Sequence, residues 1–144
     1  MTTYATRNDL NRVFGKDNID RWADPENSGS DPAWITERIN WACEIGSANF
    51  EGRLAEGPYA IPIEMDGNND YPPMVVLIVA SIAGVTLYDT RRVADSDGND
   101  QVAQQRKNFE LFIRQIMRGQ LKLTFKDGTK LDKTAQNSPA VATE

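Results

Sequence analysis

Residues 73–88 read PMVVLIVASIAGVTLY, and this stretch decides the fold. Its apolar residues leave almost no polar face over about four helical turns, which is typical of an element buried on every side. The stretch is rich in β-branched residues, so a buried strand is a competing interpretation. However, about twenty residues pass without a turn signal between Pro73 and Val93, which is too long for an ordinary strand. We therefore expect a helix from Pro73 to Val93 at the centre of the core.

A second helix is predicted upstream, because Asp31 is a suitable N-cap, Pro32 fits the first helical position, and Gly57-Pro58 follows an expected end near residues 54–56. Two adjoining apolar stripes run along it, one of Ile35, Ile39, Ala42, Cys43, Gly46 and Phe50, the other of Trp34, Trp41, Ile45 and Ala48. Together they cover more than half of the helix, whereas a surface helix needs one stripe. We expect this helix to pack on two sides. Core packing is the ordinary explanation of the second stripe, and a subunit interface is the alternative.

Two further helices flank these. The first begins at a capping box of Thr6 and Asp9 and stops at Gly15, with a short turn of helix after it. The last runs from a cap at Asp100 to a stop at Gly119.

Beyond Gly119, alternating residues from 121 to 125 predict a short strand with nothing local to pair with, and residues 127–144 form a polar tail. The sequence thus predicts an all-α fold of four main helices in one domain (residues 1–119), followed by a short C-terminal strand and an extended tail (residues 120–144). The tail lysines suit ordinary solvation, or an arm that folds on an acidic partner.

Catalytic and metal chemistry are poorly supported. The chain of 144 residues has no histidine and one cysteine, which excludes His-dependent triads and His-ligated metals. Cys43 lies on an apolar stripe and is expected to be a buried thiol. An EF-hand alignment from Asp95 fails, because Asp100 takes the glycine position and Arg106 the final glutamate position. We expect no enzymatic activity, no cofactor and no metal.

The charge is unevenly distributed. Residues 1–70 carry 6 Lys/Arg and 13 Asp/Glu, a net −7, and residues 71–144 carry 10 and 8, a net +2. This pattern offers no basic surface for gripping nucleic acid. The apolar run from Met74 to Leu87 is shorter than the roughly 18–20 residues that span a bilayer. We expect a soluble intracellular protein that binds no membrane.

Several motifs in this order resemble the small head–tail connector (adaptor, or head-completion) proteins of Mu-like and other long-tailed phages. The matching segments are YATRNDL at 4–10, ANFEGRL at 48–54, YAIPI at 59–63, the Pro72-Pro73 step before the apolar helix with Leu87-Tyr88, and IMRGQLKL at 116–123. The resemblance covers residues 2–125. It implies a structural protein of the virion neck, present in the host cytoplasm during assembly. Such proteins form rings, commonly of twelve copies, that lie between the portal and the tail or stopper and extend the DNA channel.

For such a ring, we expect the subunit and partner contacts at Trp34, Trp41, Ile45, Leu121, Leu123, Phe125, Lys122 and Lys126. The expected partners are further copies of the chain, the portal protein and a tail stopper or terminator. Double-stranded DNA would pass an acidic lumen without specific binding. The alternative is a small α-helical regulatory or protein-binding module that acts as a monomer or dimer. A carboxylate-dependent enzyme is a weaker alternative.

Overall fold

The computed structural model describes residues 3–24, 32–91 and 99–131. It contains five helices in these ranges: α1 (Arg7–Phe14), α2 (Lys16–Ala23), α3 (Pro32–Leu54), α4 (Pro73–Asp89) and α5 (Asp100–Met117). The all-α prediction is confirmed. The short turn expected after Gly15 is a helix of eight residues, α2, because the positive φ of Gly15 (92°) bends the chain between two helices without an intervening loop.

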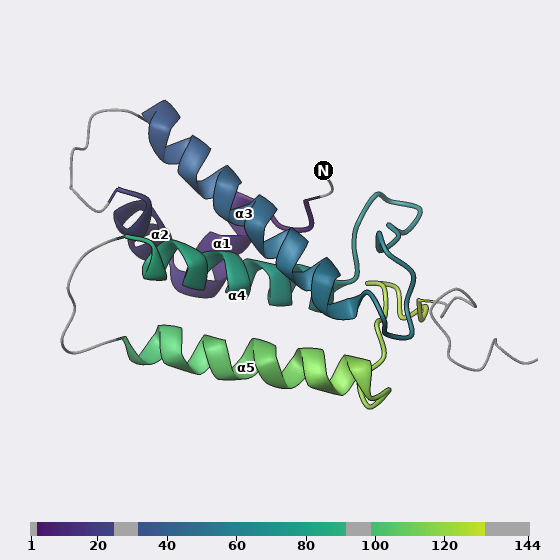
Figure 1. The fold of residues 1–144 in the computed structure, drawn as a ribbon. Helices are drawn as coiled ribbons and strands as arrows, with labels where there is room; N and C mark the ends of the chain where they lie inside the picture. The colour runs from purple at the N-terminus through teal and green to yellow at the C-terminus, as the bar shows by residue number, and fades with distance from the viewer. Residues whose placement is uncertain (1–2, 25–31, 92–98, 132–144) are drawn as a thin grey trace, which may run out of the picture.

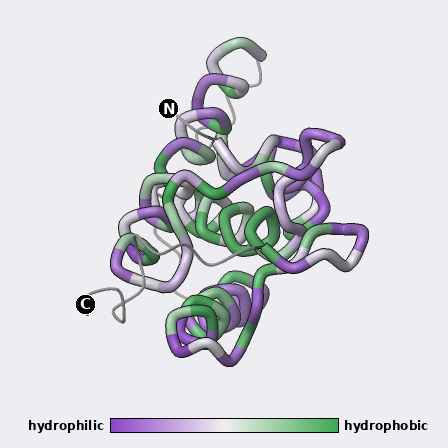
Figure 2. The backbone as a smooth tube through the Cα atoms, turned by 90° about the vertical axis from the view of Figure 1, so that its right-hand side faces the viewer, coloured by the Kyte–Doolittle hydropathy of each residue, from purple (hydrophilic) through white to green (hydrophobic). Residues whose placement is uncertain are grey.

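Helix α4 is the centre of the fold. It lies between α3 and α5, with α1 and α2 packed on a further side (Figure 1). Figure 2 shows its hydrophobic backbone trace enclosed by the other elements. The helical interpretation of residues 73–88 is thus confirmed over the strand alternative, although the helix ends at Asp89 and not at Val93. The side chain of Asp89 there receives two hydrogen bonds from Arg106 of α5, at 2.9 and 3.0 Å.

Two glycines allow close packing on α4. A Cβ atom on Gly46 of α3 would lie 3.0 Å from the carbonyl oxygen of Val79 and 3.3 Å from Cβ of Ala83. A Cβ atom on Gly84 of α4 would lie 2.0 Å from the ring of Phe14 in α1. The absence of side chains at these two positions therefore sets how closely α3 and α1 approach the central helix.

The ends of the flanking helices agree with most of the sequence signals. The Thr6 backbone N–H donates to Asp9 at 2.8 Å, as the capping box predicted. Gly119 has φ 74° directly after the last turn of α5, as predicted. The cap predicted at Asp100 is wrong, because Asn99 has the extended backbone of an N-cap and accepts from the Val102 N–H at 3.0 Å. The cap predicted at Asp31 lies outside the described residues.

The segment after Gly119 folds back on the body. Thr124 and Lys130 form an isolated antiparallel bridge, and the Leu131 N–H donates to the Leu123 carbonyl at 2.8 Å. The expectation of a strand without a local partner is therefore wrong, since the chain turns at Gly128 (φ 92°) and pairs with itself over a few residues. The Leu123 N–H also donates to the Tyr59 hydroxyl at 3.0 Å. Residues 120–131 thus belong to the folded body, and the expected extended tail is left to residues 132–144, outside the described part.

Candidate subunit interface

The outer face of α3 carries a row of large exposed side chains. Trp34, Trp41 and Ile45 are 41%, 40% and 41% exposed. With Arg38 they follow a spacing of four, three and four residues, which places them on one side of the helix. The other stripe is buried from Ile39 to Phe50, and Ile35 at its start is half-buried against the core. Of the two predicted stripes, one thus packs inside the chain and the other lies at the surface. We call Trp34, Arg38, Trp41 and Ile45 the α3 ridge.

Arg38 contacts both tryptophans of the ridge. Its guanidinium carbon lies 5.5 Å from the ring centroid of Trp34 and 5.6 Å from that of Trp41. Its Nη2 atom lies 3.4 Å from the hydroxyl of Thr90, just beyond the end of α4. Each exposed cation–π contact contributes about 0.5–1 kcal/mol, which favours this arrangement of the rings over others. The ridge is therefore a row of apolar side chains joined by a shared cation.

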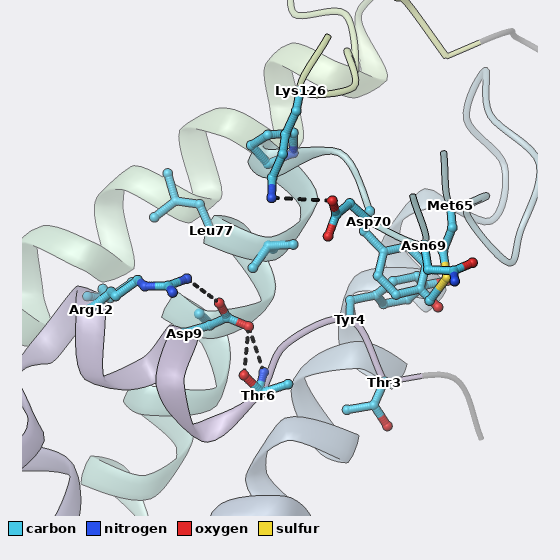
Figure 3. Close-up of a pocket in the computed structure, with 15 residues that line it drawn as sticks. Thr3, Tyr4, Thr6, Asp9, Arg12, Met65, Asn69, Asp70, Leu77 and Lys126 are labelled. Carbon is cyan, nitrogen blue, oxygen red and sulfur yellow. Dashed lines mark hydrogen bonds and ion pairs between the residues drawn. The ribbon is translucent and has the colours of Figure 1, made fainter. Parts of the chain in front are cut away.

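A groove of about 610 Å³ lies between α1, the N-terminal half of α4 and the loop before α4 (Figure 3). Its apolar lining includes Val13, Val76 and Leu77. Leu77 is 37% exposed, and Met65 from the loop is 45% exposed. Large apolar side chains left open in a concave surface are typical of a binding site. We call this feature the α1/α4 groove.

Two ion pairs border the groove. The Nη1 atom of Arg12 lies 3.2 Å from Oδ1 of Asp9, and the Nζ atom of Lys126 lies 3.4 Å from Oδ2 of Asp70 (Figure 3). In each pair the cation is the more exposed partner: the side chain of Arg12 is 78% exposed against 17% for Asp9, and that of Lys126 is 64% exposed against 41% for Asp70. The rim therefore presents positive charge outward on top of an apolar floor.

Comparison with known families identifies the group to which this chain belongs. The family model described as "Bacteriophage Mu, Gp36" matches residues 4–142. The chain belongs to this phage Mu Gp36 family. No curated protein matches it. The match spans all five helices, the ridge and the groove, and it confirms the expectation of a Mu-like phage protein.

The residues predicted as contacts of this Gp36-family protein fall in three places. Trp34, Trp41 and Ile45 lie together on the α3 ridge, and Lys126 lies on the rim of the groove. In the segment after α5, Leu123 is fully buried, Leu121 and Phe125 are half-buried against the core, and Lys122 is exposed. Leu123, Leu121 and Phe125 therefore pack the segment against its own chain.

Sequence reasoning missed most of the groove. Met65, Leu77 and Val13 come from a loop and two helices, and each alone has the pattern of a core or loop residue. The signal that could have found Leu77 is the all-apolar surface of α4, since its four neighbouring helices leave part of that surface uncovered. Without the tertiary arrangement, that uncovered side cannot be identified.

The titratable groups inside the fold have structural roles. Burial, with smaller contributions from Asp9 and Glu44, raises the pKa of the Cys43 thiol to about 12. Burial also raises the pKa of Tyr4, whose hydroxyl donates to Glu51 and accepts from the Ile63 N–H at 3.0 Å. A thiol that stays protonated is a poor nucleophile. In the described part of the chain, no three His, Cys, Asp or Glu side chains are grouped to hold a metal ion. Likewise, none of the helices described there is long and apolar enough to cross a membrane.

Proposed function

We propose that this phage protein is a structural head–tail connector, which forms a ring between the portal and the tail or stopper and extends the DNA channel. The observation that carries the proposal is the α3 ridge, because two tryptophans and Ile45, each about 40% exposed on one face of a helix, are typical of a surface that contacts another protein. Membership of the phage Mu Gp36 family supports the virion context. In this proposal the chain has no enzymatic activity, and it is found in the virion neck and, during assembly, in the host cytoplasm.

The charge distribution supports a channel that DNA can slide through. Residues 1–70 carry a net −7, from 6 basic and 13 acidic residues. A channel wall with this negative charge does not attract the phosphates of DNA, so it does not bind the DNA that passes through. We therefore propose that some of these carboxylates line the lumen in the ring. A ring in which they all lie on the outside would contradict this part of the proposal.

The experiment is electron microscopy and mass measurement of the purified protein, alone and mixed with portal rings from the same phage. The proposal predicts rings of this chain seated on the portal, and antibody labelling at the neck of purified virions. A monomer or dimer that ignores the portal, together with virions that lack the chain, would instead favour a small regulatory or protein-binding module. In that case the α3 ridge would serve a different protein partner.

A further inference from the structure

The α3 ridge and the α1/α4 groove lie on different sides of the central helix. Gly46, on the buried face of α3, packs on Val79 and Ala83 of α4. Leu77, in the groove, is two positions from Val79 in the sequence. Residues two positions apart in an α-helix lie about 200° apart around its axis, so Leu77 and Val79 are on nearly opposite sides of α4. The ridge lies on the exposed side of α3, away from the buried stripe that contains Gly46, and the groove lies beside Leu77 on another side of α4 (Figure 3).

This placement suits one kind of self-association. A ring is built from heterologous contacts, in which one side of a copy meets a different side of the next. A ridge that paired with its own equivalent would close a two-fold dimer instead. We infer that the α3 ridge of one copy docks into the α1/α4 groove of the next copy, an inference that rests on the ring in the proposed function.

The apolar parts of the two surfaces match in kind. The ridge offers two tryptophans and Ile45, and tryptophan is among the residues that most often supply the energy of an interface. The groove offers a volume of about 610 Å³ over Leu77, with Met65 at its edge. Methionine adapts its shape to an incoming side chain. Docking would cover the exposed apolar side chains of both surfaces in one contact.

The charges of the two surfaces also match. Glu37 and Glu44 lie beside the ridge, on the neighbouring face of α3, and both are exposed. Neither forms an ion pair with a described residue. They are seven residues apart, or about 10 Å along the helix. The groove rim presents the cations Arg12 and Lys126 outward. Glu37 and Glu44, beside the ridge, would therefore approach the two cations of the rim, each of which already has a carboxylate neighbour on its inner side. Two ridges packed against each other would instead bring Arg38 and the same two glutamates toward their equivalents, so the charges favour docking into the groove.

The test uses two variants of the full chain that each disable one surface. Trp41→Asp places a charge on the ridge, and Leu77→Asp places one in the groove. Each alone should lose ring formation, with self-association weakened at least about thirtyfold. An equimolar mixture should form a heterodimer and stop there, because it retains one intact ridge and one intact groove. Mass photometry and native mass spectrometry measure both outcomes.

Leu111→Asp is the matched control, because Leu111 is 42% exposed on α5, outside both surfaces. This variant should assemble as the wild type does. Circular dichroism establishes that each variant is folded, and Met65→Asp replaces Leu77→Asp if the latter unfolds.

Three results would overturn the inference. If Leu77→Asp and Met65→Asp both form normal rings, the groove is not the docking site. If the groove variant still dimerises and the ridge variant does not, the ridge pairs with itself. If the wild type forms no ring, alone or on the portal, the proposed function and the inference both fail. The first two results, in contrast, overturn the inference and leave the proposed ring intact.

Discussion

Replacing Gly84 with alanine should destabilise the protein, although alanine is the better helix former. Gly84 lies within α4, and a Cβ atom there would be 2.0 Å from Cε2 and 2.4 Å from Cδ2 of Phe14. Ordinary carbon contacts are about 3.5–4.0 Å, so the ring would have to move by about 1.5 Å. Phe14 is 2% exposed and packs edge-to-face on Trp22 with centroids 5.4 Å apart. The ring therefore has little room to move.

The expected magnitude follows from two opposing effects. Overpacking a well-packed core costs about 1–3 kcal/mol and sometimes more, and removal of a buried phenylalanine side chain costs about 3–5 kcal/mol, which sets an upper bound. Alanine returns about 1 kcal/mol of helix propensity. Because the buried ring would have to move by about 1.5 Å, we place the overpacking cost at about 2–4 kcal/mol, and we expect a net loss of about 1–3 kcal/mol in the free energy of unfolding. For a chain of this size that loss lowers Tm by roughly 3–10 °C.

Urea denaturation followed by circular dichroism measures the loss, with thermal unfolding as a second readout. The control is Gly52→Ala in α3, where a Cβ atom would have no neighbour within 4 Å. That variant should be neutral or up to about 1 kcal/mol more stable. In a Phe14→Leu background the cost of Gly84→Ala should fall by at least about 1 kcal/mol, because the smaller side chain leaves room. Gly84→Ala as stable as the wild type would refute the packing of α1 on α4 described above.

Three further predictions concern a helix cap, a thiol and an ion pair. Asn99→Ala should lower the free energy of unfolding by about 1 kcal/mol in urea titrations, because it removes the α5 cap, whereas Asp100→Ala should change it much less. Cys43 in the native protein should be modified far more slowly than an exposed cysteine at both pH 7 and pH 9, because burial raises its pKa to about 12 and leaves only about 0.1% thiolate even at pH 9, against roughly three quarters for an ordinary cysteine; modification at the global unfolding rate would agree with this, and fast native labelling would not. Burial opposes ionisation of Asp20, but hydrogen bonds from Lys16 and Arg7 outweigh it and lower the pKa. Asp20→Asn should therefore reduce stability at pH 7 by at most about 1 kcal/mol, and the difference should shrink as the pH falls through that pKa, since protonation then removes the same interaction from the wild type; a difference that does not shrink as the pH is lowered would contradict this.

The helices could be predicted from the sequence because their signals are local. Apolar residues at helical spacing, a proline at the first position of α3 and Gly119 after α5 each act within a few residues. The predicted position of the α5 cap differs by one residue from the observed one for a related reason. Asn99 and Asp100 are both good caps by residue type, and only the extended backbone at Asn99 decides between them.

The attachment of residues 120–131 could be predicted only in part. Asp127-Gly128 is a local turn signal that favours a hairpin, and its recognition would have supplied the missing partner for Thr124. The hydrogen bond from Leu123 to the Tyr59 hydroxyl joins residues 64 positions apart. No periodicity within either segment indicates this contact. The sequence alone therefore predicts an extended arm for residues 120–144.

The number and order of exposed apolar side chains distinguish the α3 ridge from other surface positions. A single exposed residue such as Leu111 is ordinary on a protein surface and needs no explanation. Two tryptophans and an isoleucine on one helix face form a continuous patch, which monomeric proteins rarely leave in water. Because both rings already contact Arg38, docking on them costs less side-chain entropy than docking on rings without such a contact. An apolar surface of this kind is suited to repeated docking of identical copies, and this argues for α3, and not α5, as the helix that projects into the neighbouring molecule.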